Sequence, residues 1–162
     1  MYENGVVKGI SENAFAPDVP ITRAQFATMI LNLIGIDEIA ENIEFSDVGD
    51  EDWFEDAVLK VASKGYMNGF DGKFRPNDYI TREEICVVIK NVVNAELEEI
   101  VREEFSDEEN ISDWAKDAVT FTVISGIVKG KGSNMFAPKD NATRAEGLVM
   151  LKRMTDKLEV AK

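Results

Sequence analysis

Three arginines in this chain stand where they could bind an anion. Arg23, Arg82 and Arg144 each follow a threonine directly, in the stretches ITRAQ, ITREE and ATRAE. A threonine followed three residues later by Glu or Gln predicts the start of a helix. The arginines would then lie in a first helical turn, where the macrodipole disfavours a cation. Free backbone N–H groups beside a planar guanidinium form a site for a carboxylate, so we interpret the arginines as anion-binding residues.

Two structural roles compete with this interpretation. Capping boxes require only the threonine and the acid or amide, and we predict six structural capping residues: Thr22, Gln25, Thr81, Glu84, Thr143 and Glu146. The arginines have no part in capping, but each could pair with a carboxylate four or five residues earlier, at Asp18, Asp78 or Asp140. A surface pair of this kind contributes only about 0 to 1 kcal/mol. Both roles stay open at this point.

The three stretches belong to a longer repeat. Gly5, Gly65 and Gly126 are 60 and 61 residues apart, and the arginines follow a similar spacing of 59 and 62 residues. We expect a single domain over residues 1–162, made of repeat one (1–44), repeat two (45–104) and repeat three (105–162). Repeat one lacks its first helix, and we expect this truncated edge to associate with another copy of the chain.

Each complete repeat predicts a helix, a glycine-bearing loop and a second helix. Trp53, Ala57 and Val61 would share one face of the first helix in repeat two. The loop ends in Phe-x-Pro, and its phenylalanine is expected to fill the core. One helical hairpin of this size cannot bury its own apolar side. We therefore expect three helix-loop-helix repeats around a common axis, in an all-α domain with pseudo-threefold symmetry.

Several residues beside the arginines could contact a sugar. The tryptophans either pack in the core or stack on a pyranose, and the aspartates either cap the turn before the first helix or bind hydroxyls. The glycines either allow backbone amides close to a ligand or only permit a turn. These further candidate ligand-binding residues are Trp53, Trp114, Asp47, Asp107, Gly9, Gly69 and Gly130.

Composition excludes several functions. The net charge of −13 disfavours nucleic acid and adsorption to an anionic membrane. The chain has no histidine, which removes the commonest general base and metal ligand, and we expect no cofactor and no metal. Cys86 is the single cysteine and lies in an apolar run, so it is expected to be a buried small hydrophobe. The N-terminus lacks the pattern of a signal peptide, which suggests a processed product or a fragment.

The order of these motifs resembles that of the S-layer homology domain, whose usual unit is three tandem copies. The shared elements are F-S-D, W, A-V, a glycine, F-x-P and T-R-[AE]-[EQ]. The resemblance implies a three-pronged helical assembly that binds secondary cell-wall polysaccharide on Gram-positive bacteria, often through pyruvylated sugars. It also implies that the Thr-Arg-Ala-Glu motif and the grooves between repeats carry the binding. Departures from the pattern are Gln25 in place of Glu, Glu83 in place of Ala, and an extra residue between Asp107 and Trp114.

We therefore expect a non-catalytic, extracellular module that anchors its parent protein to the cell wall or S-layer. Its partner would be an anionic secondary cell-wall polysaccharide, such as a pyruvylated one, bound in grooves between repeats. The alternative is a self-association or protein-docking domain of a surface-layer protein. On either view, removal of Arg82 or Arg144 is expected to spare stability, whereas removal of the capping threonines is expected to lower it.

Overall fold

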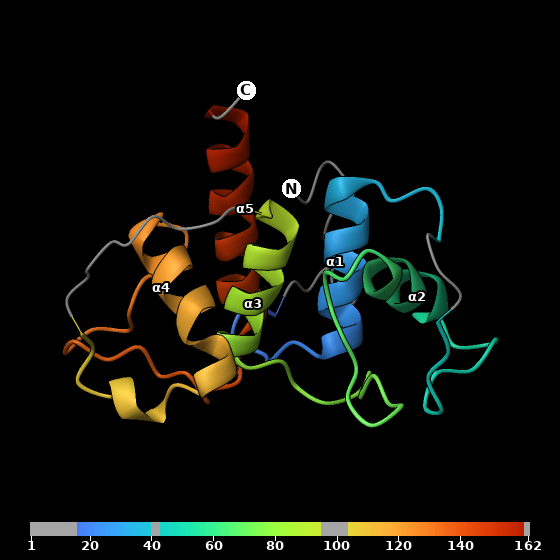
Figure 1. Ribbon diagram of the computed structural model, residues 1–162, viewed down its shortest axis with the longest axis horizontal. Helices are drawn as coiled ribbons and strands as arrows, with labels where there is room; N and C mark the ends of the chain where they lie inside the picture. Colours follow the sequence, from blue (N-terminus) through green and yellow to red (C-terminus); the bar gives the residue numbers. More distant parts are fainter. Residues whose placement is uncertain (1–15, 40–42, 95–103, 161–162) are drawn as a thin grey trace. The chain divides into compact units, whose positions relative to one another are not determined.

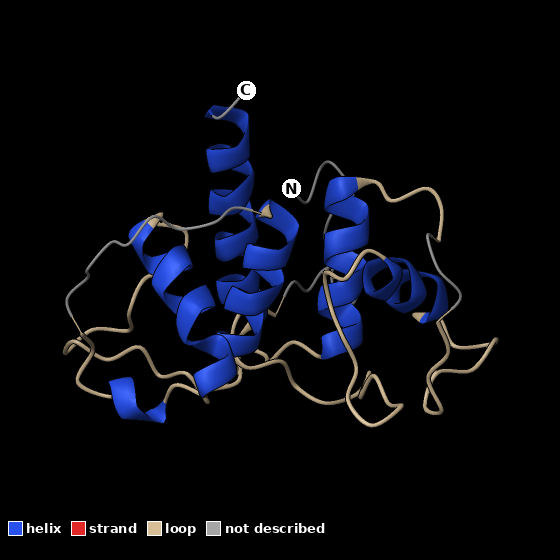
Figure 2. Cartoon of the chain, viewed as in Figure 1, coloured by secondary structure: helices blue, strands red, loops and turns tan. Residues whose placement is uncertain are grey.

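A computed structural model describes residues 16–39, 43–94 and 104–160 of the chain. Within these ranges the chain forms helices joined by long loops (Figure 1), and isolated β-bridges are its only extended pairing (Figure 2). The predicted all-α class is confirmed. Among the described helices, none has the length and apolar character that crossing a membrane requires.

The chain divides into two compact units, Met1–Ile80 and Thr81–Lys162. In the first unit α1 packs against α2, and in the second α3 packs against α4 and α5. Each unit therefore joins the second helix of one repeat to the first helix of the next. The elements in chain order are α1 (Arg23–Ile34), α2 (Glu55–Ser63), α3 (Arg82–Val93), the 3-10 turns η1 (Glu108–Asn110) and η2 (Asp113–Ala115), α4 (Lys116–Ile124) and α5 (Arg144–Val160).

The helices that follow the threonines begin at capping boxes. In α1 the hydroxyl of Thr22 accepts from the backbone N–H of Gln25, and the Gln25 side chain accepts from the N–H of Thr22. The same reciprocal bonds join Thr81 to Glu84 and Thr143 to Glu146. These contacts satisfy backbone donors that the first helical turn leaves free.

The core contains the phenylalanines of the Phe-x-Pro loops but excludes the tryptophans. Phe74 and Phe136 are fully buried, as expected, whereas Trp53 is 67% exposed and Trp114 is 60% exposed. The predicted shared face of Trp53 with Ala57 and Val61 is therefore wrong. The α-helices begin only after the tryptophans, so helical periodicity does not apply to them. The next residue along, Phe54 or Ala115, is buried instead.

The glycine-bearing loop folds as a tight hairpin that leaves no room for a side chain at one position. A Cβ atom on Gly69 would lie 2.5 Å from the carbonyl oxygen of Lys73 and 2.5 Å from the ring of Phe45. Gly130 is equally confined, with 2.7 Å to the carbonyl oxygen of Met135. These glycines are therefore required by close packing of the hairpin.

Gly69→Ala should destabilise the first unit by roughly 2 kcal/mol, because backbone and a packed ring would have to move. Urea unfolding followed by circular dichroism measures this loss. Gly49→Ala is the matched control, since its Cβ would meet only the Asp52 carboxylate at an ordinary 3.7 Å. Equal stability of the two variants would contradict the steric explanation.

Candidate functional site: a cationic pocket in the second unit

The guanidinium of Arg82 is buried and binds backbone carbonyls of the loop before α5. Its Nε donates to the carbonyl of Phe136 at 3.0 Å, and its Nη2 donates to the carbonyl of Lys129 at 2.8 Å. The guanidinium also lies over the Phe136 ring, 5.2 Å from the centroid, a favourable cation–π distance. Arg82 thus ties the first turn of α3 to the loop of the following repeat.

The first unit contains the same arrangement around Arg23. Its Nε donates to the carbonyl of Phe74 and its Nη2 to the carbonyl of Asn68, both at 2.9 Å. The guanidinium lies 4.9 Å from the centroid of the Phe74 ring. Because two repeats show the same contacts, the position of this arginine is explained by the loop that it holds.

The predicted aspartates bind the backbone amides of the two phenylalanines whose carbonyls bind the arginines. Asp47 accepts from the N–H groups of Phe74 and Arg75 at 2.8 Å. In the second unit Asp107 accepts from Phe136 and Ala137 at 2.8 and 2.7 Å. The expectation that these aspartates cap the local turn is wrong, because both carboxylate oxygens bind amides 27 to 30 residues away.

The aspartates also stabilise an unusual backbone conformation before each proline. Arg75 has φ = 60° and Ala137 has φ = 56°, in the left-handed region that residues other than glycine rarely adopt. The backbone N–H of each donates to an aspartate carboxylate, Arg75 to Asp47 and Ala137 to Asp107. The loop is therefore clamped by an aspartate at the amides and an arginine at the carbonyls.

The remaining candidates have separate locations. The exposed tryptophans remain available to a ligand, and Arg144 is 6% exposed, with burial lowering the pKa of its guanidinium. Gly9 lies outside the described residues, as do parts of the acidic connectors. A ligand-binding role for Arg23, Arg82, Arg144, Trp53, Trp114, Asp47, Asp107, Gly69 and Gly130 therefore stays a prediction.

Glu83, which departs from the pattern, is a buried anchor for the segment before α4. Its carboxylate accepts from the backbone N–H and the hydroxyl of Ser112, both at 3.0 Å, and from the ammonium of Lys139 at 2.6 Å. A carboxylate in the first turn of α3 also complements the helix dipole. Its counterpart in α5 is Ala145, which lines a pocket instead.

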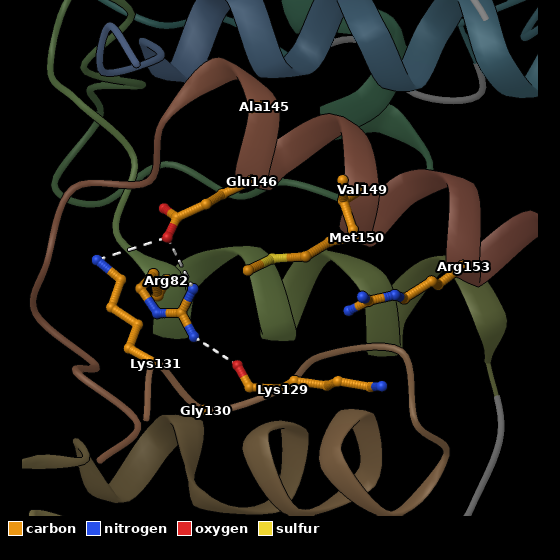
Figure 3. Close-up of a pocket in the computed structure, with 9 residues that line it drawn as sticks. All are labelled: Arg82, Lys129, Gly130, Lys131, Ala145, Glu146, Val149, Met150 and Arg153. Carbon is orange, nitrogen blue, oxygen red and sulfur yellow. Dashed lines mark hydrogen bonds and ion pairs between the residues drawn. The ribbon is translucent and has the colours of Figure 1, made fainter. Parts of the chain in front are cut away.

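A pocket of about 440 Å³ lies in the second unit between α5 and the hairpin loop (Figure 3). Its lining combines four cations, one carboxylate and a small apolar surface: Arg82, Lys129, Gly130, Lys131, Ala145, Glu146, Val149, Met150 and Arg153. The volume is in the range of a site for a small ligand. On a chain of net charge −13, this lining is a local positive region suited to an anion.

Sequence reasoning found Arg82 and Gly130 in this pocket but missed Lys129, Lys131 and Arg153. The motifs consist of residues common to the repeats, whereas Lys131 and Arg153 are peculiar to repeat three and Lys129 has its only cationic counterpart at Lys8 of repeat one. The signal that could have found them is the local stretch VKGKG, which carries two lysines where repeat two has MNGFD. Which helix face would join that loop could not be read from the sequence.

The described residues do not indicate a reactive cysteine or a metal site. Burial raises the pKa of the Cys86 thiol to about 12, so this cysteine does not form a thiolate at neutral pH. Within the described ranges, no three His, Cys, Asp or Glu side chains are grouped so as to hold a metal ion. The pocket is therefore the candidate site.

Capped helices, clamped loops and tandem copies define a helical-repeat module with a cationic pocket. The chain belongs to the S-layer homology domain family, whose model matches residues 1–27, 44–86 and 104–146. The three matches agree with the three repeats expected from the sequence. The match to repeat two ends in the first turns of α3.

The chain is similar to parts of much longer proteins. It is 38% identical to an exoglucanase, XynX, of Acetivibrio thermocellus, over 94% of this chain and 14% of that protein. It is 37% identical to an amylopullulanase of Thermoanaerobacterium thermosulfurigenes, over 94% of this chain and 8% of that protein. A cellulosome-anchoring protein of Acetivibrio thermocellus is 29% identical, over 93% of this chain and 35% of that protein.

Arg82→Ala should lower the free energy of unfolding by about 3 kcal/mol, because the carbonyls of Phe136 and Lys129 would lose a buried charged donor. This prediction replaces the expectation from the sequence that arginine removal spares stability, because the structure shows the buried contacts of Arg82. Urea unfolding measures the loss. Arg75→Ala is the control, since Arg75 is exposed and Ala137 already occupies the equivalent position. A fully stable Arg82→Ala variant would contradict the clamp.

Thr81→Ala should cost about 1 kcal/mol, because the α3 capping box loses its hydroxyl acceptor. Thr81→Ser keeps the hydroxyl and should be close to wild type in a thermal melt. If alanine and serine lowered the melting temperature equally, the methyl group and not the cap would be responsible.

Proposed function

We propose that the chain is a non-catalytic anchoring module that binds an anionic secondary cell-wall polysaccharide, such as a pyruvylated one, at the cell surface. The observation that carries the proposal is the pocket of the second unit, where four cations surround one carboxylate. A carboxylate on a sugar supplies the negative charge that this lining lacks. The family and its relatives, which include proteins named as a surface-layer protein and a cellulosome-anchoring protein, support the anchoring role.

The apolar part of the pocket favours a sugar over a simple anion. Val149 is 44% exposed and lines the pocket with Met150 on the α5 side (Figure 3). Such side chains can pack against the C–H face of a pyranose, while cations bind its carboxylate. The pocket thus offers both kinds of contact that an acidic sugar needs.

The bulk negative charge of the chain does not prevent binding of an acidic polymer. At physiological ionic strength, salt screens charges beyond roughly 8 Å. The cations that line the pocket act within that distance on a bound carboxylate, whereas most acidic residues of the chain do not line it. Local charge therefore decides the interaction.

The pocket does not support glycan hydrolysis. Glycosidases use two carboxyl groups on either side of the scissile bond, and Glu146 is the only carboxylate that lines this pocket. Its oxygens already bind the backbone of Thr143, Arg82 and Lys131. Catalytic activity in a longer parent protein would belong to other parts of that protein.

The full chain should bind purified, pyruvylated cell-wall polysaccharide and lose most of this affinity when the polysaccharide carboxylates are reduced to alcohols. We expect a decrease of about tenfold or more, because charge-assisted hydrogen bonds are lost. Biolayer interferometry with immobilised polysaccharide measures both affinities.

Dextran, a neutral polysaccharide, is the control for unspecific binding. Equal affinity for the intact and the reduced polymer would overturn carboxylate recognition. Binding to neither polymer, together with concentration-dependent dimers in light scattering, would favour the self-association alternative. Release of new reducing ends would restore the enzyme hypothesis.

A further inference from the structure

The pocket has two ends that differ in charge balance (Figure 3). At one end the ammonium of Lys131 lies 2.9 Å from Asp140 Oδ2 and 3.5 Å from Glu146 Oε1. Arg82 Nη1 lies 3.5 Å from the same oxygen of Glu146. Two cations thus meet two carboxylates, and this end of the pocket has little remaining attraction for a further anion.

The other end carries Lys129 and Arg153. In Figure 3 the guanidinium of Arg153 and the ammonium of Lys129 both lie on the side of the pocket away from Glu146. No carboxylate in the described part of the chain forms an ion pair with either cation. Among the described residues, this end therefore holds two positive charges without a paired counterion.

Backbone contacts hold the side chain of Arg153 and the loop that carries Lys129. Arg153 Nη1 donates to the carbonyl of Ile127 at 3.4 Å, which leaves its other donors for a ligand. The carbonyl of Lys129 accepts from Arg82 Nη2 at 2.8 Å, so the clamp fixes the loop that carries the lysine. Preorganised donors of this kind bind an anion at a low entropic cost.

We propose that the carboxylate of the bound polysaccharide lies between Lys129 and Arg153, and that Arg82 is a positioning residue. This inference rests on the proposed function and assigns the charge recognition to one end of the pocket. The repeated arginine then stabilises the loop, and the pair of cations that recognises the anion occurs only in repeat three.

The two other repeats lack this pair of cations. Arg153 stands ten residues after its capping threonine, where repeats one and two have Asn32 and Asn91. Lys129 stands three residues after the loop glycine Gly126, where repeat two has Asn68 and repeat one has Lys8. Only the third repeat has cations at both positions, so the sequence contains one such pair of carboxylate-binding cations.

The test compares Lys129→Gln and Arg153→Gln with wild type, using the full chain and the intact and carboxyl-reduced polysaccharides. Each variant should lower the affinity for the intact polymer by about tenfold, the size expected for one charge-assisted contact. Affinity for the reduced polymer should stay nearly unchanged. The double variant should show no preference between the two polymers.

Two control variants remove the same charge elsewhere. Lys131→Gln should lower the preference less than Lys129→Gln does, because its ammonium is already paired with Asp140 and Glu146. Lys73→Gln removes an exposed charge from the hairpin of the first unit and should have no effect. Thermal melts of all variants should coincide with wild type, which separates lost binding from lost folding.

The outcomes separate the inference from the function on which it rests. A wild-type chain that does not distinguish the two polymers would overturn the proposed carboxylate recognition itself. If the double variant still bound the intact polymer more tightly than the reduced one, as wild type does, only the placement of the carboxylate between Lys129 and Arg153 would be overturned. A larger effect of Lys131→Gln than of Lys129→Gln would place the carboxylate at the other end of the pocket.

Discussion

The structure depends on a buried arginine that holds the loop of the following repeat. Placing a guanidinium in the first turn of a helix opposes the helix dipole, and burying it removes its hydration. Arg23 and Arg82 both offset these costs with two carbonyl acceptors and the face of a phenylalanine. Only a planar side chain with several fixed donors can satisfy two carbonyls in this way, which explains why arginine and not lysine follows the threonine.

The clamp explains features of the loop that otherwise look unrelated. The aspartate of the F-S-D motif binds the amides of the phenylalanine and the next residue, while the arginine binds the phenylalanine carbonyl. Fixing these groups allows a left-handed residue before proline and brings the hairpin so close to Phe45 or Phe105 that only glycine fits. A rigid loop then presents Lys129 and Lys131 to the pocket. Structural motifs are thus shared by the repeats, while charges beside them determine what one repeat can bind.

This division of roles also reconciles an acidic chain with the anionic ligand that we propose. Most acidic residues lie outside the pocket, and the carboxylates near it are paired with Lys131 and Arg82. The two cations at the far end keep their charge for a ligand. Relatives that are much longer than this chain include proteins named as glycan-degrading enzymes and as anchoring proteins, which agrees with one binding module serving different parent proteins.

The sequence by itself determined the repeats, the starts of the helices that follow the threonines, the family and the buried phenylalanines, because these follow from local spacing and capping chemistry. It did not reveal the partners of Arg82 or Asp107, which lie 29 to 54 residues away, since long-range partners leave no periodic signal. It misplaced the tryptophans, because the helix begins after them and the chain turns there. The pocket was decided only by the tertiary structure, which brings α5 beside the loop and so joins cations that are far apart in the chain.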